Sequence, residues 1–554
     1  MASAPDAPAR PTSRLLRVEG DRGPSLAERL SVEIGRLSHG TLLHRLQLRG
    51  RFPAQLLGRP VDPFPGDPAR GRAILAARAH GRGPLGTPPA RWGADTHGFT
   101  WLRDVAAADP HGLRAQVQPV LGPWLARFGH YDALAWRPDV LGQRTLAFAL
   151  HAPALLATSD LVHRSALLGA LARGTRHLAG VLGQAPEGMA RVHAGAGAIA
   201  GALLVPHAEG ELIRAERAFA RILDEFVGAD GGVASRAPID MLETLELLVT
   251  LGACYAARAR PQPAPQRAAR TRLAPALAGL AHAHGALAAF HGGVSVAAAR
   301  VRRALLLADA RGCVPAAPSG YLRLDAGGAM VLFDAGPPPE SRLSHGAHAG
   351  TLAFEFSHGD QPLIINCGGA RGGWRAPPPD IAPLLRTTAA HSTLVVADTN
   401  STRLREDGRL GAGVVEVVAS HEEHPVGVIA EAQHDGYARR HGLIHIRRLF
   451  LSHDGCDLRG EDRLAAAVRR RPAGVTFDIR FHLAPGVAVD ADADTGEAIL
   501  RHAAGQWRFA ARGAALAIED SLAFTAGGRI ERTRQLVLSG TGPGTVAWAL
   551  RALN

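Results

Sequence analysis

The sequence of 554 residues contains no lysine, so all 62 of its basic residues are arginines. A GC-rich genome explains this bias, because arginine codons are GC-rich, but the physical consequence holds whatever the cause. Every guanidinium group is a planar fork that suits paired contacts with carboxylate or sulfate groups. The formal net charge is +12, which makes a polyanionic partner plausible.

Several other features are scarce, and each absence excludes a class of protein. No run approaches twenty apolar residues, so no membrane-spanning helix is expected. The first thirty residues lack the charged start and apolar run of a secretory signal, which favours the cytoplasm. No helix-turn-helix, zinc finger or aromatic–basic sheet signature is present, so nucleic acid is not the expected partner. The cysteines have no CxxC spacing, which argues against a zinc-thiolate site or a disulfide framework: Cys254, Cys313, Cys367 and Cys456.

The length predicts two or three domains, and the hydrophobic period changes once along the chain. Residues 1–24 are rich in Pro, Ala and Arg, which predicts a disordered basic N-terminus. Residues 25–316 are dominated by apolar residues at spacings of three and four, which predicts helical hairpins stacked in a ring or arc. Residues 317–554 contain many short β-rich runs separated by turn residues, which predicts an antiparallel β-sandwich. The expected fold class is therefore α+β and multidomain.

The densest group of polar residues begins the strand-rich half. His345 and His348 precede one predicted strand, Asn366 ends the next, and Arg386 and His391 precede a later one. If neighbouring strands pair, these side chains converge at one sheet edge. Imidazole exchanges protons near neutral pH and also binds metals. A chain with 26 histidines also places some of them together by chance.

Several ordered motifs resemble the heparinase II/III-like family. In the second half they are His348-Ala-Gly-Thr-Leu-Ala-Phe-Glu-Phe-Ser, Ile365-Asn-Cys-Gly and Thr388-Ala-Ala-His-Ser-Thr-Leu; in the first half Trp101-Leu-Arg-Asp and the segment 230–238 fit as well. The resemblance spans most of residues 98–554. It implies an incomplete (α/α) toroid followed by a β-sandwich, and polysaccharide lyase chemistry. It also suggests the cell envelope, in conflict with the missing signal peptide.

A lyase of this kind neutralises a uronate carboxylate, removes the C5 proton and expels the O4-linked sugar, which requires a base, an acid and donors on the carboxylate. On the resemblance, we assign catalytic roles to His348, His391 and His345. The substrate-binding candidates are Asn366, Arg386, His193 and Trp101. His193 lies where the family has an Asn-His segment, and Trp101 is suited to stacking on a sugar ring. Packing inside the helical half is the competing interpretation of both.

The sequence departs from the family at two places. In metal-containing relatives, the positions of His348, Asn366 and His391 bind a structural zinc ion. Here Gly350 and Asn366 replace the acidic residues of the family pattern, and an amide is a poor zinc ligand. Zinc is therefore left open as a cofactor. The Tyr-His pair expected in the helical half corresponds to Asp240 and Met241, so the proton-transferring tyrosine is missing.

Three functions follow from these observations. The first is a carbon–oxygen lyase that cleaves a uronate-containing acidic polysaccharide by β-elimination. The second is a non-catalytic relative that binds acidic glycans during exopolysaccharide handling, which the missing tyrosine favours. The third is an (α/α) glycoside hydrolase with paired carboxylates, although its candidates form no recognisable pair: Asp104, Asp139 and Asp230. The specific polymer and the oligomeric state are not encoded in any recognisable motif.

Overall fold

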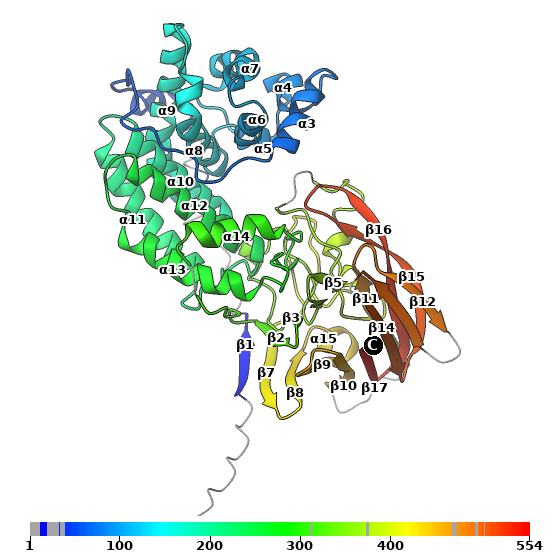
Figure 1. The fold of residues 1–554 in the computed structure, drawn as a ribbon. Helices are drawn as coiled ribbons and strands as arrows, with labels where there is room; N and C mark the ends of the chain where they lie inside the picture. The colour runs from blue at the N-terminus through cyan, green and yellow to red at the C-terminus, as the bar shows by residue number, and fades with distance from the viewer. Residues whose placement is uncertain are drawn as a thin grey trace, which may run out of the picture.

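The computed structural model describes residues 12–18, 33, 39–310, 313–372, 376–467, 474–492, 497–503 and 505–553. Its first half is helical and its second half is built from strands (Figure 1). The helices of the first half are α2 (Leu42–Gln47), α3 (Pro68–Arg78), α4 (Gly83–Gly86), α5 (Ala94–His97), α6 (Leu102–Ala108), α7 (Leu113–Phe128), α8 (Pro138–Leu155), α9 (Leu161–Val181), α10 (Met189–Leu204), α11 (Glu209–Phe226), α12 (Pro238–Ala256), α13 (Ala264–Gly279) and α14 (Ala298–Leu307). None of these described helices is long and apolar enough to cross a bilayer.

The strands form two antiparallel sheets that face each other, and together with the helical half they confirm the predicted fold class. One sheet has the order β1-β7-β8-β9-β10-β17-β14-β13-β12, and the other β15-β16-β11-β5-β4-β3-β2, with β6 paired to β11. The strands are β1 (Thr12–Arg17), β2 (Tyr321–Ala326), β3 (Ala329–Asp334), β4 (Phe354–His358), β5 (Gln361–Ile365), β6 (Leu394–Val396), β7 (Glu416–His424), β8 (Gly427–His434), β9 (Leu443–Ser452), β10 (Asp457–Ala466), β11 (Val475–Leu483), β12 (Ala488–Asp492), β13 (Glu497–His502), β14 (Gly505–Arg512), β15 (Ala515–Phe524), β16 (Ile530–Gly542) and β17 (Gly544–Leu553).

The helices form because their apolar residues recur on one face. On α11 the buried residues are spaced by three and four, as in Leu212, Ala215 and Phe219, which is the period of an amphipathic helix. Helices α8 and α10 approach each other unusually closely. A Cβ atom added to Gly197 would lie 2.2 Å from the carbonyl oxygen of Gly142, so glycine is required where the two backbones meet.

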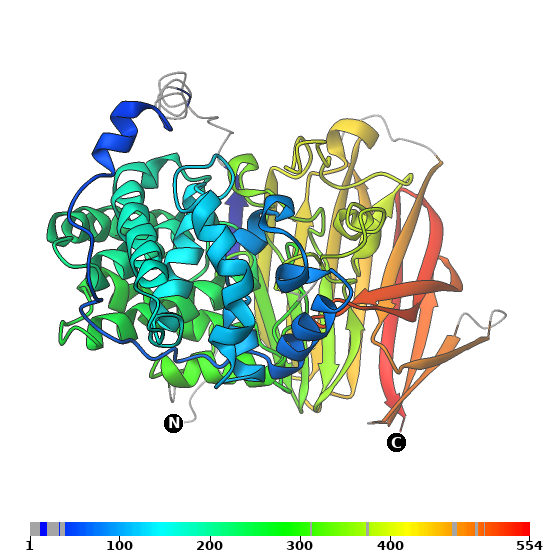
Figure 2. The same cartoon turned by 90° about the horizontal axis from the view of Figure 1, so that it is seen from above.

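Strand β3 joins the two halves of the molecule because both of its faces are buried. Val331 and Phe333 point into the core between the two sheets. Met330 and Leu332, which alternate with them, belong to the core of the helical half. The sequence of a strand that buries one face in each core is a nearly continuous run of apolar residues. The helical half therefore packs directly on this sheet, as the view from above shows (Figure 2).

The prediction that residues 1–24 are disordered is wrong for Thr12–Arg17. These residues form β1, which pairs antiparallel with β7 along the edge of the larger sheet. Backbone hydrogen bonds to an edge strand require no apolar side chains, and Leu15 remains 62% exposed. Composition therefore gave no signal for this strand. Residues 1–11 and 19–24 lie outside the described residues.

Two short 3-10 helices, η1 (Pro89–Arg91) and η2 (Leu182–Gln184), lie in the helical half. The remaining short helices lie in the strand-rich half, and several of them flank the site described next. They are η3 (Ser341–Leu343), η4 (Leu384–Arg386), η5 (Thr388–Ala390) and α15 (Ala438–His441). The last helix of the first half ends at Leu307 and β2 begins at Tyr321, on either side of the boundary predicted at residue 316.

Candidate functional site

Two of the predicted catalytic histidines are in direct contact. His348 follows η3 and His391 follows η5, and the Nδ1 atom of His348 lies 3.1 Å from Nε2 of His391. Nδ1 of His391 donates to the carbonyl oxygen of Thr387 at 2.8 Å. In the neutral state Nε2 of His391 is therefore the acceptor and Nδ1–H of His348 the donor. Nε2 of His348 is left as the unprotonated nitrogen of the pair.

The histidine pair is neutral at physiological pH. His348 and His391 are 3% and 2% exposed. Burial lowers the pKa of His391 to about 4 and the pKa of His348 well below its usual range. His391 and His291 lower the pKa of His348 further, and His291 also lowers that of His391. An imidazole with a pKa so far below 7 is a weak general base, because catalytic efficiency is highest when the pKa lies near the working pH.

Asn366, at the end of β5, is held by contacts of its own. Its Nδ2 donates to Oε1 of Glu355 at 3.1 Å, and its Oδ1 accepts from the backbone N–H of Ser392 at 3.0 Å. The amide nitrogen and the amide oxygen thus each have a hydrogen-bond partner, and the contact to Ser392 places Asn366 next to His391. These contacts do not fit a zinc ion held by His348, Asn366 and His391, because the amide oxygen already accepts a hydrogen bond and is a poor zinc ligand.

A buried ionic network crosses the boundary between the two halves. Arg236, which precedes α12, donates to Oδ1 of Asp334 at the end of β3 at 2.7 Å. Nε2 of His291 lies 3.3 Å from the other oxygen of the same carboxylate. Arg236 and His291 lower the pKa of Asp334 in spite of its burial. Nδ1 of His291 is buried without a hydrogen-bond partner among the described residues.

The position expected to hold the catalytic tyrosine is occupied by a second ion pair. Oδ2 of Asp240, in the first turn of α12, accepts from Nη2 of Arg371 at 2.8 Å and from the hydroxyl of Ser235 at 2.6 Å. Asp240 is 2% exposed, and the adjacent Met241 is 1% exposed. Burial raises the pKa of Asp240, while Arg371 and Ser235 lower it. The Asp240 carboxylate is thus a structural partner of Arg371.

His193 faces a carboxyl group that the sequence analysis did not single out. Its Nε2 lies 3.9 Å from Oε2 of Glu243 on α12, and both side chains are partly exposed. Burial raises the pKa of Glu243 to about 7 and lowers the pKa of His193 to about 4. A carboxyl group with a pKa near 7 can donate or accept a proton under physiological conditions.

The other predicted site residues have different surroundings. Arg386 donates from Nε and Nη2 to the carbonyl oxygen of Ala347 at 3.0 and 2.9 Å, so it positions the backbone beside His348. His345 is exposed next to Gly408. The assignment of Trp101 to substrate binding is wrong. Its ring is 5% exposed and lies in the aromatic core of the helical half, where its indole N–H donates to the carbonyl oxygen of Thr96.

No exposed phenol replaces the missing tyrosine within the described parts of the chain. The ring of Tyr131 packs against a separate group of histidines in the helical half. The other three tyrosines are buried, and burial raises the pKa of each. Each donates its hydroxyl group to a protein acceptor: Tyr255 to Glu216, Tyr321 to the carbonyl oxygen of Arg236, and Tyr437 to the carbonyl oxygen of Leu394.

Sequence reasoning missed Glu243 and the arginine–aspartate pairs for different reasons. Asp240, Glu243 and Glu246 recur every three residues on α12, a helical spacing that was available as a signal. The contact of Arg236 with Asp334 joins residues 98 apart in sequence, and no local pattern marks such a pair.

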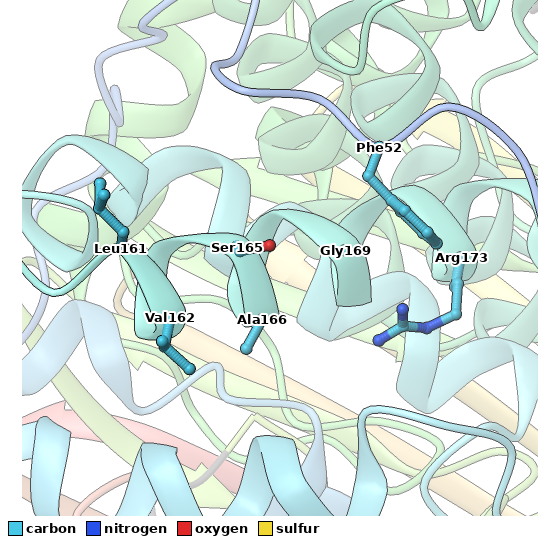
Figure 3. A pocket seen from close by; sticks show the side chains of 7 residues that line it. All are labelled: Phe52, Leu161, Val162, Ser165, Ala166, Gly169 and Arg173. Carbon is cyan, nitrogen blue, oxygen red and sulfur yellow. The ribbon is translucent and has the colours of Figure 1, made fainter.

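Two open grooves on the described part of the surface do not include the histidine pair. One, of about 500 Å³, is lined by Phe52 and by one face of α9 from Leu161 to Arg173 (Figure 3). Another, of about 340 Å³, lies between β1, β7 and residues 315–323. Neither groove includes His348, Asn366 or His391 in its lining.

Comparisons with known proteins agree with the fold. Residues 309–549 match the family described as Heparinase II/III-like, C-terminal. The chain is 34% identical over 486 residues to FtsZ-localized protein C of Caulobacter vibrioides (strain NA1000 / CB15N), covering 83% of each chain. The crystal structure of heparinase III superposes with a TM-score of 0.67 at 11% identity, covering 97% of this chain and 93% of that one. A heparan sulfate lyase HepC mutant from Pedobacter heparinus gives a TM-score of 0.55 at 13% identity, covering 95% and 88%.

Proposed function

The chain belongs to the heparinase II/III-like family and has the fold of a polysaccharide lyase, and on that premise we propose that it is a non-catalytic member that localizes with FtsZ. The proposal rests on the Asp240–Arg371 ion pair, which stands where the family resemblance expects the tyrosine that transfers a proton. A buried carboxylate at that position repels the carboxylate of a uronate and cannot take the place of a phenol.

The state of the histidines supports the same proposal. His348 and His391 are hydrogen-bonded to each other and buried, with pKa values well below neutrality. A lyase needs donors for the substrate carboxylate and a base of matched pKa. Here Arg236 in the helical half and Arg371 in the strand-rich half are each already paired with an aspartate, and Arg386 is bound to the carbonyl oxygen of Ala347.

The localization part of the proposal comes from the relative named FtsZ-localized protein C, which shares 34% identity over 83% of this chain. That identity extends well beyond the residues of the C-terminal family match. A fluorescent fusion expressed together with labelled FtsZ tests this part directly. We expect the fusion to coincide with FtsZ; an even distribution through the cell contradicts it.

The proposal that the protein is non-catalytic is tested by looking for a cleavage product. β-Elimination creates a conjugated double bond that absorbs ultraviolet light, whereas hydrolysis creates a reducing end without it. We expect purified protein incubated with a panel of uronate polymers to produce neither signal, with an active heparinase as the positive control. A rise in absorbance that depends on protein concentration overturns the non-catalytic proposal.

A lyase that cleaves a uronate-containing polysaccharide is the second candidate, favoured by the unprotonated Nε2 of His348 and by the pKa of Glu243. In that reaction a base removes the C5 proton, the C4–C5 double bond forms as the C4–O4 bond breaks, and an acid protonates the leaving oxygen. Replacing His348 or His391 by Ala then lowers the rate by roughly 10²–10⁴-fold. Replacing the exposed His111 by Ala is the control.

The wild type and the two histidine variants also distinguish binding of acidic glycans from their cleavage. If the wild type retains a uronate polymer on an affinity column without forming product, and the His348→Ala and His391→Ala variants lose that retention, the region of the histidine pair takes part in glycan binding. If all three proteins behave alike on the column, the histidine pair has no part in glycan binding.

A further inference from the structure

A second group of histidines lies in the helical half, apart from the site described above. It consists of His39, His44 on α2 and His177 on α9, and one ring nitrogen of each lies within 4.8 Å of the other two. Nε2 of His44 is 3.0 Å from Nδ1 of His177. The three ring centroids are 4.9 to 5.1 Å apart. Among the described residues, this is the one group of three or more His, Cys, Asp or Glu side chains close enough to hold a metal ion.

The local sequence brings His39 and His44 together by a tight turn. Gly40 adopts a left-handed backbone conformation with φ of +84°, which glycine adopts without strain. Thr41 then caps α2 by accepting the backbone N–H of His44, so both histidines face the same side. The ring of Tyr131 closes the turn, because a Cβ atom on Gly40 would lie 3.3 Å from it. The dark-blue segment that holds α2 lies beside α9 in Figure 1.

The surroundings keep the three imidazoles neutral. His44 and His177 are 6% and 4% exposed. Burial lowers the pKa of all three, that of His177 to about 3, and no carboxylate opposes the effect. A neutral imidazole offers the lone pair that a metal needs, so an ion does not have to displace a proton from a charged ring.

We propose that His39, His44 and His177 bind one divalent transition-metal ion of the zinc class. Imidazole nitrogen suits Zn²⁺, Cu²⁺ and Ni²⁺, and three protein ligands leave one position for water or another ligand. The ion replaces the proton shared by His44 and His177. The backbone N–H of Gly40 donates to Nδ1 of His44, so in the metal-free protein that ring carries its proton on Nε2. On binding, the proton moves to Nδ1, and the Gly40 hydrogen bond is given up.

The ion links two parts of the chain that are 133 residues apart. It fastens the segment before and within α2 onto α9. That segment carries Leu42, Leu43 and Leu46, all more than half exposed, so the metal fixes the orientation of an exposed apolar helix. This role is independent of the histidine pair in the strand-rich half and of the proposed function.

The test uses the full chain and Co²⁺ as a spectroscopic probe, followed by Zn²⁺ competition and elemental analysis after dialysis. The variant His177→Gln keeps an acceptor for His44 but is a poor ligand, so the packing is retained. His44→Gln is a second variant. The controls are His111→Gln, which removes an exposed histidine, and His391→Gln, which removes the pair in the strand-rich half. Circular dichroism of each variant serves to check that it is folded.

We expect one equivalent of Co²⁺ with visible absorption in the wild type and in both controls. In His177→Gln and His44→Gln we expect weaker binding by at least the roughly 10–100-fold that loss of an outer-shell partner causes. Zn²⁺ should raise the unfolding temperature of the wild type but not of these two variants. Wild-type binding no tighter than that of His177→Gln overturns the proposal. Loss of the ion in His391→Gln alone also overturns it.

Discussion

Replacing Asp462 by Asn should strongly destabilise the strand-rich half, because among the described residues this carboxylate is the one ion-pair partner of the fully buried Arg447. Asp462 on β10 faces Arg447 on β9 in the sheet register, and both side chains are 0% exposed. The carboxylate accepts two hydrogen bonds from Arg447, at 2.8 and 3.1 Å, one from His445 at 2.7 Å and one from Trp548 at 2.9 Å.

The effect should extend to the histidine pair, because Arg447 also organises the loops that carry it. Nη1 of Arg447 donates to the carbonyl oxygens of Leu352 and Ser392, at 2.8 and 2.7 Å. Ser392 follows His391 directly. Without its counter-charge, Arg447 is either a buried uncompensated cation or must leave its place, and in both cases the two loops lose an anchor.

Breaking a buried ion pair by removing one partner costs about 3–5 kcal/mol, and we expect a loss of that size for Asp462→Asn. Chemical denaturation followed by near-ultraviolet circular dichroism measures it. Hydrogen exchange of the backbone around residues 350–353 and 391–393 should accelerate. The matched control is Asp520→Asn, whose 93% exposed carboxylate pairs with Arg534 and should leave the unfolding midpoint unchanged. A loss below about 1 kcal/mol for Asp462→Asn refutes this account of the pair.

Three further perturbations test the site and the core. The free energy of unfolding should fall as the pH drops from 6.5 toward 4. In this range the histidine of the unfolded chain takes up a proton, whereas buried His391, with its pKa of about 4, does not. Thermal unfolding of His391→Gln should therefore depend less steeply on pH. Trp101→Ala should lower the free energy of unfolding by about 3–5 kcal/mol and leave any glycan retention unchanged, since the ring is part of the core. Gly197→Ala should destabilise by about 1–3 kcal/mol because of its 2.2 Å contact, whereas Gly180→Ala, with nothing within 4 Å, should stabilise α9 slightly in the same denaturation experiment.

The elements that were predictable from sequence are those whose signals are local. The spacing of Leu212, Ala215 and Phe219 predicts α11, and the short apolar run of β3 predicts a buried strand. Strand β1 could not be predicted, because it is ordered by backbone pairing with β7 rather than by its side chains. The burial of Trp101 could not be predicted either, since an aromatic ring in a helical hairpin has the same local pattern whether it faces the core or a groove.

At the histidine site, each of the two residues that replace an acid of the family pattern fits the side chain beside it. A Cβ atom on Gly350 would lie 2.6 Å from Cδ2 of His391, so the imidazole ring fills the space that an acidic side chain at that position requires. Restoring an acid at residue 350 therefore displaces His391 and breaks its hydrogen bond with His348. Restoring an acid at residue 366 places a second carboxylate against Glu355, which now accepts from the amide of Asn366. Each of these substitutions therefore conflicts with a neighbouring side chain, His391 in one case and Glu355 in the other.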